Sequence, residues 1–292
     1  MKIFKGIGTA LITPFDENFN VDTEALKNLT GHIIKNDGDF LVALGTTSEA
    51  PTLSRQEKEL VLDTITKTNN NRLPVVVGIG GNNTKKVVEE INYFASKYDF
   101  QAVLSVCPYY NKPNQRGLYK HFATIAEATD KNIIIYNVPG RTSSDILPET
   151  VLELARNYKN IIAIKEASGK IERGMDIIQG LERNDFSVLS GDDPLFLAEL
   201  SVGYDGVISV ITNAYPKEFA QMRKELLQGN FTQAHKYHYA LYTLIKLIFR
   251  EGNPTGIKAL LKLKGIINTD NLRLPLVSAS GDLKEALKQA LI

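Results

Sequence analysis

The sequence predicts an α/β protein, a (β/α)8 TIM barrel with a C-terminal helical extension. Short apolar runs rich in β-branched residues alternate with longer segments of helical period, and the alternation yields eight strand candidates. Runs that are apolar throughout suit strands buried on both faces, which is typical of a parallel sheet closed into a barrel. A doubly wound open sheet is the alternative, but it usually has about five or six strands and a phosphate-binding glycine loop.

The expected strands and helices follow one another along the chain. The strands span residues 6–12, 40–44, 74–78, 102–106, 132–136, 161–165, 187–190 and 206–210. Amphipathic stretches between them predict helices at 24–35, 55–68, 85–97, 118–128, 149–157 and 194–201. Ser54 and Glu57 have the spacing of a capping box, which marks the start of the second helix.

The strand signal stops after about residue 225. Residues 231–250, 255–264 and 283–291 then predict three helices, separated by turn-forming segments at 252–254 and 272–275. A barrel of this class typically takes ~250 residues or fewer. We therefore expect a barrel domain of residues 1–225 and a helical domain of residues 226–292.

The composition is that of an ordinary globular protein, with 43% apolar and 23% charged residues among 292. A formal net charge of +1 leaves no excess that would hold a polyanion or an anionic membrane. The N-terminus lacks an apolar signal-peptide core, and no stretch approaches the roughly 18 apolar residues of a membrane span. The single cysteine, Cys107, cannot form an internal disulfide. We expect a cytoplasmic protein with neither a nucleic-acid nor a membrane partner.

Other kinds of site find little support in the sequence. A glycine cluster after the third strand lacks the last glycine of the dinucleotide motif. Asp192 and Asp193 are adjacent acids with no histidine nearby in the sequence, which disfavours a required metal. Cys107 has no histidine in its segment to activate it, so a buried thiol is expected. His235 and His238 share a helix face with residues typical of packing.

The catalytic residues of such barrels lie at the C-terminal ends of the strands. Lys165 directly follows the apolar run IIAI, so its side chain is expected at the mouth of the barrel. Burial at such a place disfavours a charged ammonium, and a neutral amine can attack a carbonyl to form a Schiff base. An ion pair, for example with Glu166, is the alternative interpretation of this lysine.

Polar residues also end the neighbouring strands. Tyr136 ends the fifth strand, where its phenol could pass protons to and from a carbinolamine, although a core tyrosine is the usual reading elsewhere. Thr46 and Thr47 follow the second strand and offer hydroxyls and amides to a carboxylate or a proton relay. Arg141 could bind a substrate carboxylate with both arms of its guanidinium, although most loop arginines are solvated.

Six segments at or near the expected strand ends carry a resemblance to a known family. They are GTTSE at 45–49, PYYNKP at 108–113, YNVPGRT at 136–142, IKEASG at 164–169, SGDD at 190–193 and GVISV at 206–210. On these motifs the chain resembles the dihydrodipicolinate synthases, which belong to the pyruvate-dependent class I aldolases together with N-acetylneuraminate lyase. The match runs nearly end to end, and the six motifs together are highly specific.

The resemblance implies a reaction and a set of catalytic residues. Lys165 would form an imine with pyruvate, and the derived enamine would attack the aldehyde of L-aspartate semialdehyde before the product cyclises. Tyr136, Thr46 and Tyr110 would form the proton relay. No metal or organic cofactor is expected, because the imine itself serves as the electron sink.

The resemblance also implies binding residues and an assembly. Thr47 would hold the carboxylate of pyruvate, and the carbonyl groups of Gly191 and Ile208 would line the pocket. Arg141 would bind the carboxylate of the second substrate. Tyr110 would enter the active site of a neighbouring subunit, which implies a homo-oligomer, usually a tetramer built from tight dimers.

The chain departs from part of the family at two places. Ser48 stands where a glycine is usual, and we expect altered loop geometry rather than lost chemistry. The positions at which lysine-inhibited members bind lysine correspond here to Ala50, Pro51, Arg55, Lys58 and Lys86. Three cations would repel the ammonium of that ligand, so we expect no inhibition by lysine. A carboxylate from Glu57 or Glu89 that reaches the ligand is the alternative.

Other functions stay open at this point. An N-acetylneuraminate lyase or a keto-deoxy sugar acid aldolase would use the same chemistry, but Arg141 favours an aldehyde that carries a carboxylate. A catalytically silent barrel would have no chemical reason to keep Lys165, Tyr136 and Thr46. A phosphate-binding barrel enzyme would favour a glycine-rich loop after the seventh or eighth strand, where two aspartates would instead repel a phosphate.

Overall fold

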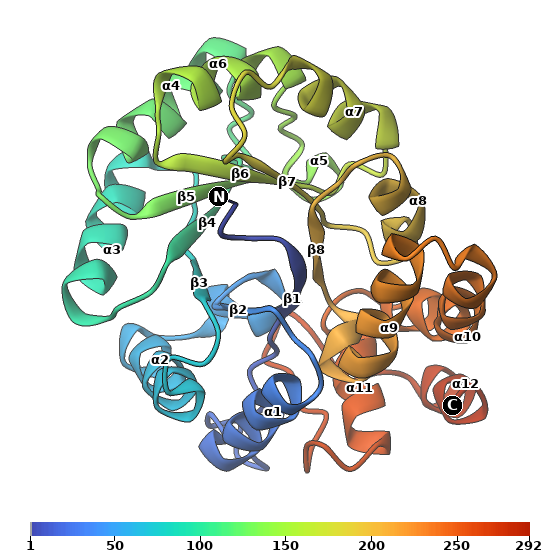
Figure 1. Cartoon of the computed structure of the whole chain (residues 1–292). Helices are drawn as coiled ribbons and strands as arrows, with labels where there is room; N and C mark the ends of the chain where they lie inside the picture. The colour runs from blue at the N-terminus through green and yellow to red at the C-terminus, as the bar shows by residue number, and fades with distance from the viewer. Residues whose placement is uncertain (1) are drawn as a thin grey trace. The chain divides into compact units, whose positions relative to one another are not determined.

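The strands close into a barrel. The computed structural model describes residues 2–292. Within them, eight parallel strands form a closed barrel in sequence order (Figure 1). The strands are β1 (Gly6–Ala10), β2 (Phe40–Ala43), β3 (Val75–Gly78), β4 (Ala102–Val106), β5 (Asn132–Asn137), β6 (Ile161–Glu166), β7 (Ser187–Ser190) and β8 (Gly206–Ser209). Each predicted strand is present and its ends differ from the prediction by two residues at most, so the predicted (β/α)8 barrel is confirmed.

Burial on both faces explains why the strands read as continuous apolar runs. Every residue of β1, β2, β7 and β8 is buried, and Ile133, Ile134 and Ile135 of β5 are fully buried. β5 and β6 pair in parallel register, with Tyr136 opposite Lys165. The register therefore brings the polar ends of these two strands side by side.

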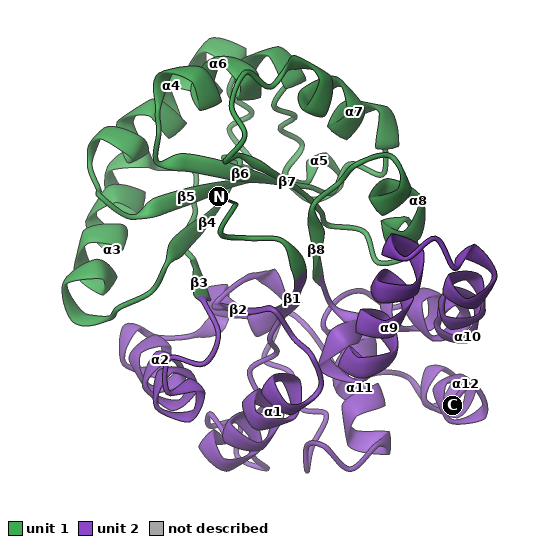
Figure 2. Ribbon diagram, viewed as in Figure 1, with its two compact units in different colours: residues 1–6, 75–208 green, residues 7–74, 209–292 purple. Residues whose placement is uncertain are grey.

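The chain forms two compact units, coloured separately in Figure 2. The first unit comprises residues 1–6 and 75–208, and the second comprises residues 7–74 and 209–292. The helices of the first unit are α3 (Thr84–Lys97), α4 (Gln115–Glu127), α5 (Pro139–Thr142), α6 (Pro148–Asn157), α7 (Ile171–Gly180) and α8 (Phe196–Ser201). Those of the second are α1 (Thr23–Lys35), α2 (Arg55–Asn69), α9 (Pro216–Leu227), α10 (Phe231–Phe249), α11 (Thr255–Leu263) and α12 (Gly281–Gln289). The second unit also holds three 3-10 turns, η1 (Thr46–Ser48), η2 (Ala50–Thr52) and η3 (Ile211–Asn213).

Side-chain caps start most of the helices that the sequence predicts. The capping box at α2 is formed as expected, since Ser54 accepts from the Glu57 amide and Glu57 accepts from the Ser54 amide. Asp22, Asn83 and Asn114 cap α1, α3 and α4 in the same position. These hydrogen bonds satisfy backbone amides that have no partner within the first turn of a helix.

Two barrel helices, α7 and α9, are not among the predicted ones. Lys170 precedes α7 and makes no side-chain cap, whereas α9 begins with Pro216, a start signal that the prediction did not use. α7 also contains Gly174, and glycine is a poor helix former. Glycine is needed at this position because a Cβ would lie 2.0 Å from the Tyr204 hydroxyl oxygen. Close packing thus outweighs helix propensity in α7.

The three predicted C-terminal helices are present as α10, α11 and α12. They lie in the same compact unit as β2 and α2, whereas the separate helical domain of residues 226–292 stays a prediction. Among residues 2–292, none of the helices combines the length and the hydropathy that a membrane span requires. No group of three or more potential metal-ligating side chains occurs within those same residues.

Candidate active site

Lys165 is buried at the C-terminal end of β6, with 6% of its surface exposed. Its Nζ lies 4.5 Å from the centroid of the Tyr136 ring on the adjacent strand β5. Tyr136 is itself only 8% exposed. The structure thus brings together the two side chains that the sequence singles out for imine chemistry and proton transfer.

Glu166 does not pair with Lys165. Successive residues of a strand point to opposite faces, and the Glu166 carboxylate meets Arg173 instead, with 3.5 Å between Oε2 and Nε. It also accepts hydrogen bonds from the Ser168 amide at 2.9 Å and from Asn137 Nδ2 at 3.1 Å. No ion pair within residues 2–292 includes Lys165, so the ion-paired alternative with Glu166 is wrong.

A polar network connects the ends of β5 and β6 to Asp145 and to Arg173 of α7. Asn137 donates to both Glu166 and Asp145, and Arg173 bridges the same two carboxylates, with 2.9 Å from Nη2 to Asp145 Oδ1. Burial raises the pKa of the Glu166 carboxyl, while hydrogen bonds from Ser168 and Asn137 act in the opposite direction. Sequence reasoning misses Arg173, because one arginine in an amphipathic helix carries no signal of its own.

Gly191 directly follows β7 and borders the lysine. A Cβ at this position would lie 2.9 Å from Lys165 Cε and 2.4 Å from Ala167 Cβ. The Gly191 amide donates to the carbonyl oxygen of Glu166 at 2.7 Å, which holds the turn against the end of β6. Only glycine leaves the space that Lys165 occupies.

Two further acids lie near this turn. The Asp192 carboxylate accepts a hydrogen bond from the Gly169 amide at 3.1 Å. Burial raises the pKa of Asp192, while the hydrogen bond from the Gly169 amide and the nearby Lys165 act in the opposite direction. Glu199 of α8 is 1% exposed, and burial raises the pKa of its carboxyl to about 8. A hydrogen bond from Ser190 acts in the opposite direction, whereas the charges of Asp192, Glu166 and Asp193 add to the rise.

The remaining predicted residues of the first unit differ in exposure. Ile208 is fully buried within β8, whereas Arg141 is exposed in the short helix α5. Tyr110 is 88% exposed and has a left-handed φ of 73°. Its loop is tied down by Asn82, whose Nδ2 donates to the Tyr109 carbonyl at 3.1 Å. The structure thus projects the Tyr110 phenol away from the surface of its own unit.

Thr46 and Thr47 lie in the 3-10 turn η1, which belongs to the second unit and follows β2. Thr46 is exposed, whereas Thr47 is 3% exposed and its hydroxyl accepts a hydrogen bond from Asn253 Nδ2 at 3.0 Å. Ser48 is also buried and donates to the Leu11 carbonyl at 2.6 Å. The hydroxyl that replaces the expected glycine is therefore fully accommodated within the loop.

Of the residues that the sequence assigns to packing, Cys107 and His238 are buried, whereas His235 is not. Cys107 is fully buried, and burial strongly raises the pKa of its thiol, so it is a poor nucleophile. The His238 ring packs edge-on against Tyr239 at 5.1 Å between centroids. His235 on the same helix is exposed.

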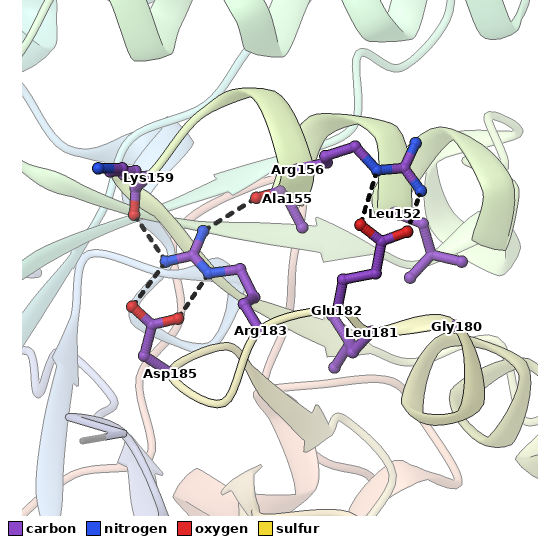
Figure 3. A pocket seen from close by; sticks show the side chains of 9 residues that line it. All are labelled: Leu152, Ala155, Arg156, Lys159, Gly180, Leu181, Glu182, Arg183 and Asp185. Atoms are coloured by element: carbon purple, nitrogen blue, oxygen red, sulfur yellow. Dashed lines mark hydrogen bonds and ion pairs between the residues drawn. The ribbon is translucent and has the colours of Figure 1, made fainter.

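A surface pocket lies in the first unit, away from Lys165 (Figure 3). Its walls come from the ends of α6 and α7 and the segments that follow them, which precede β6 and β7. Arg156 pairs with Glu182 at 2.8 Å, and Arg183 pairs with Asp185 at 2.6 Å, so both guanidinium groups already have carboxylate partners. The pocket lies at the N-terminal ends of these strands, where conserved side chains usually serve stability.

The fold and the strand-end residues together define a class of protein. A closed (β/α)8 barrel with a buried lysine and tyrosine ending adjacent strands is suited to Schiff-base chemistry on a carbonyl substrate. Residues 3–292 match the model of the dihydrodipicolinate synthetase family, and the chain belongs to that family. The resemblance predicted from the six motifs is thereby confirmed.

Individual relatives are similar over nearly the whole chain. The 4-hydroxy-tetrahydrodipicolinate synthase of Flavobacterium psychrophilum is 52% identical over 287 residues, which cover 98% of this chain and 97% of the relative. The solved dihydrodipicolinate synthase from Thermotoga maritima has a TM-score of 0.95 at 40% identity, covering 99% of this chain and 97% of that one. A solved monomeric dihydrodipicolinate synthase variant also has a TM-score of 0.95 at 40% identity, covering 99% and 96%.

Proposed function

We propose that this chain catalyses the 4-hydroxy-tetrahydrodipicolinate synthase reaction, the condensation of pyruvate with L-aspartate semialdehyde in diaminopimelate and lysine biosynthesis. The observation that carries the proposal is the buried Lys165 beside Tyr136, in a chain 52% identical to a relative of that name. A sugar-acid aldolase would share the imine, but the similar relatives described above are not sugar-acid aldolases. The reaction is cytoplasmic in this proposal and involves neither a membrane nor a nucleic acid.

Lys165 supplies the nucleophile. Its Nζ attacks the ketone carbon of pyruvate, and loss of water from the carbinolamine leaves an imine. Loss of a methyl proton then gives an enamine, whose carbon attacks the aldehyde of the semialdehyde. Tyr136 lies opposite Lys165 on the adjacent strand and is buried beside it, and this pairing supports Tyr136 as the group that carries protons during these steps.

Four residues bind the substrates in this proposal. Thr47 holds the carboxylate of pyruvate, and the carbonyl groups of Gly191 and Ile208 line the space around the imine. Arg141 binds the carboxylate of the semialdehyde. Arg141 lies in α5, directly after the C-terminal end of β5 that also carries Tyr136, and this position supports the role.

Thr46 and Tyr110 complete the proton relay with Tyr136. Tyr110 acts in the active site of a partner subunit, within a tetramer built from tight dimers. Its 88% exposure supports this role, since a side chain used inside its own subunit would be covered. The description of one relative as a monomeric variant also supports an oligomer as the usual state of the family.

Lysine does not inhibit the enzyme in this proposal. Arg55, Lys58 and Lys86 occupy positions assigned to an ammonium-binding site in inhibited members. Both alternative carboxylates are engaged elsewhere, since Glu57 pairs with Arg273 and Glu89 lies 4.0 Å from Lys85. These pairs draw both carboxylates away from a cationic ligand, which the three cations would repel.

Borohydride trapping tests the proposal. Treatment with pyruvate and borohydride should add one carboxyethyl group, which peptide mass spectrometry should locate on Lys165. The Lys165→Arg variant is the control and should give no adduct, because its guanidinium stays protonated. An adduct on another lysine, or none at neutral pH, would show that the proposed chemistry is wrong. Addition of the semialdehyde should give turnover, which a metal chelator should leave unchanged.

A further inference from the structure

Asn253 makes a buried contact with the proposed pyruvate-binding residue. It lies between α10 and α11, and its Nδ2 donates to Thr47 Oγ1 at 3.0 Å. Asn253 is 8% exposed and Thr47 is 3% exposed, and both belong to the second unit. The two residues are 206 positions apart in the sequence, so nothing in either motif points to the other.

A second contact from α11 holds the same loop. Lys258 Nζ lies 2.5 Å from Glu49 Oε1, and both side chains are fully buried. Glu49 also accepts from the Arg273 amide at 3.0 Å, and Lys258 donates to the Asn271 carbonyl at 2.9 Å. The position of the loop therefore does not depend on the Asn253 amide alone.

The direction of the Asn253 contact matters for the chemistry of Thr47. A threonine hydroxyl has one proton and two lone pairs. An amide N–H from Asn253 occupies one lone pair and leaves the proton of Thr47 available for a different acceptor. A carboxylate is an acceptor only, so a hydroxyl held in this way is prepared to donate to it.

Asn253 is also not placed to maximise stability. Its Oδ1 is buried and has no hydrogen-bond partner among residues 2–292, which costs free energy in a folded protein. An unpaired buried acceptor in a native protein is explained by a role at a functional site or by a bound water molecule. We infer that Asn253 is a positioning residue, which orients the Thr47 hydroxyl as a donor to the carboxylate of the keto acid. This inference rests on the proposed function, in which Thr47 binds that carboxylate.

A double-mutant cycle tests the inference. Asn253→Ala should raise the pyruvate concentration for half-maximal borohydride trapping by roughly 3- to 10-fold, the effect of losing one hydrogen bond. It should leave kcat within about twofold, since the chemistry at Lys165 is untouched. In a Thr47→Val background the same change should have no further effect, because the hydroxyl that Asn253 orients is gone. An equal effect in both backgrounds would overturn the inference.

Two more variants separate positioning from folding. Asn253→Asp has the same shape but can only accept, so it should bind the Thr47 proton and weaken pyruvate binding more than Asn253→Ala does. Asn69→Ala is the matched control, since Asn69 is a buried asparagine of the same unit whose side chain bonds to the backbone of Leu73. It should lower the melting temperature without changing half-saturation by pyruvate. If Asn253→Ala does not fold, the Asp variant decides alone, and unchanged half-saturation in that variant refutes positioning.

The outcomes also distinguish this inference from the proposed function. If the wild-type protein forms no adduct with pyruvate, both fail together. If the wild type forms the adduct at Lys165 but the Asn253 variants saturate at the wild-type concentration, only the positioning role fails. A lower kcat with unchanged half-saturation would place Asn253 in a different step and would equally refute the inference.

Discussion

Replacing Gly191 by alanine should displace the reactive lysine. The added Cβ would lie 2.4 Å from Ala167 Cβ, 2.9 Å from Lys165 Cε and 3.1 Å from the Glu166 carbonyl oxygen. The first two distances are well inside van der Waals contact, so something must move. Ala167 Cβ and the Glu166 carbonyl are fixed to the backbone, and Lys165 Cε is the only flexible one of the three atoms.

These contacts indicate how much the substitution should lower the stability and the rate of adduct formation. Overpacking by one methyl group in a dense interior typically costs ~1 to 3 kcal/mol of stability. A reactive atom displaced by about 1 Å loses on the order of 100-fold in rate. We therefore expect Gly191→Ala to fold with reduced stability and to form the pyruvate adduct on the order of 100-fold more slowly than the wild type.

The assay is the initial rate of borohydride trapping at saturating pyruvate, alongside a urea denaturation curve. Gly31→Ala is the control, because no atom lies within 4 Å of a Cβ built at Gly31 in α1. This variant should keep the trapping rate and should be at least as stable as the wild type, since alanine is a better helix former than glycine. Wild-type trapping by a folded Gly191→Ala protein would refute the close contact between residue 191 and the lysine.

Three further predictions concern other residues. Arg141→Ala should lower kcat/KM for the semialdehyde by an amount that corresponds to ~2 to 4 kcal/mol of lost transition-state stabilisation, while adduct formation with pyruvate survives. Equal loss of both would contradict the role assigned to Arg141. The hydrogen-bonded Arg273 guanidinium lowers the pKa of Glu57 to about 2, below its ordinary 4.5, so this pair stabilises the fold above about pH 4.5 and loses that effect as the pH falls towards 2. Urea denaturation of Glu57→Gln should accordingly show a smaller loss of stability over that range, and parallel curves would exclude the effect. Millimolar lysine should leave the initial rate unchanged, whereas half-inhibition below about 1 mM, or roughly 4 kcal/mol of binding, would show that a carboxylate does reach the ligand.

The sequence predicts most of this fold because each strand is a short apolar run that can be recognised from its own residues. The run from Ile161 to Ile164 is apolar throughout, and all four residues are buried in β6. The pattern alone therefore predicts that Lys165 lies at the end of this strand. The helices with capping side chains were equally visible, as Ser54 and Glu57 show. α7 starts without a cap, but α10 and α11 do so too and are still predicted from their helical period, so a cap is only one of the signals.

Side-chain contacts that depend on tertiary packing could not be predicted in this way. Arg173 reaches Glu166 across one turn between strand and helix, and Asn253 reaches Thr47 from more than two hundred residues away. No periodicity or spacing in the sequence indicates such a pairing, since each of these polar side chains could equally lie on the surface. The exposure of Tyr110 and the partners of Glu166 likewise depend on tertiary packing.

The buried pair of Glu49 and Lys258 constrains how this chain can change over evolutionary time. Each side chain has lost its water, so replacing one partner alone leaves a stranded charge that costs roughly 3 to 5 kcal/mol, a large part of the stability of a typical domain. Both positions must therefore be exchanged together, although they are encoded far apart. A recombinant that joined the N-terminal part of one homologue to the C-terminal helices of another would take the two partners from different parents, and the pair would be mismatched where those parents differ at either position. Successful crossovers should keep Glu49 and Lys258 from the same parent.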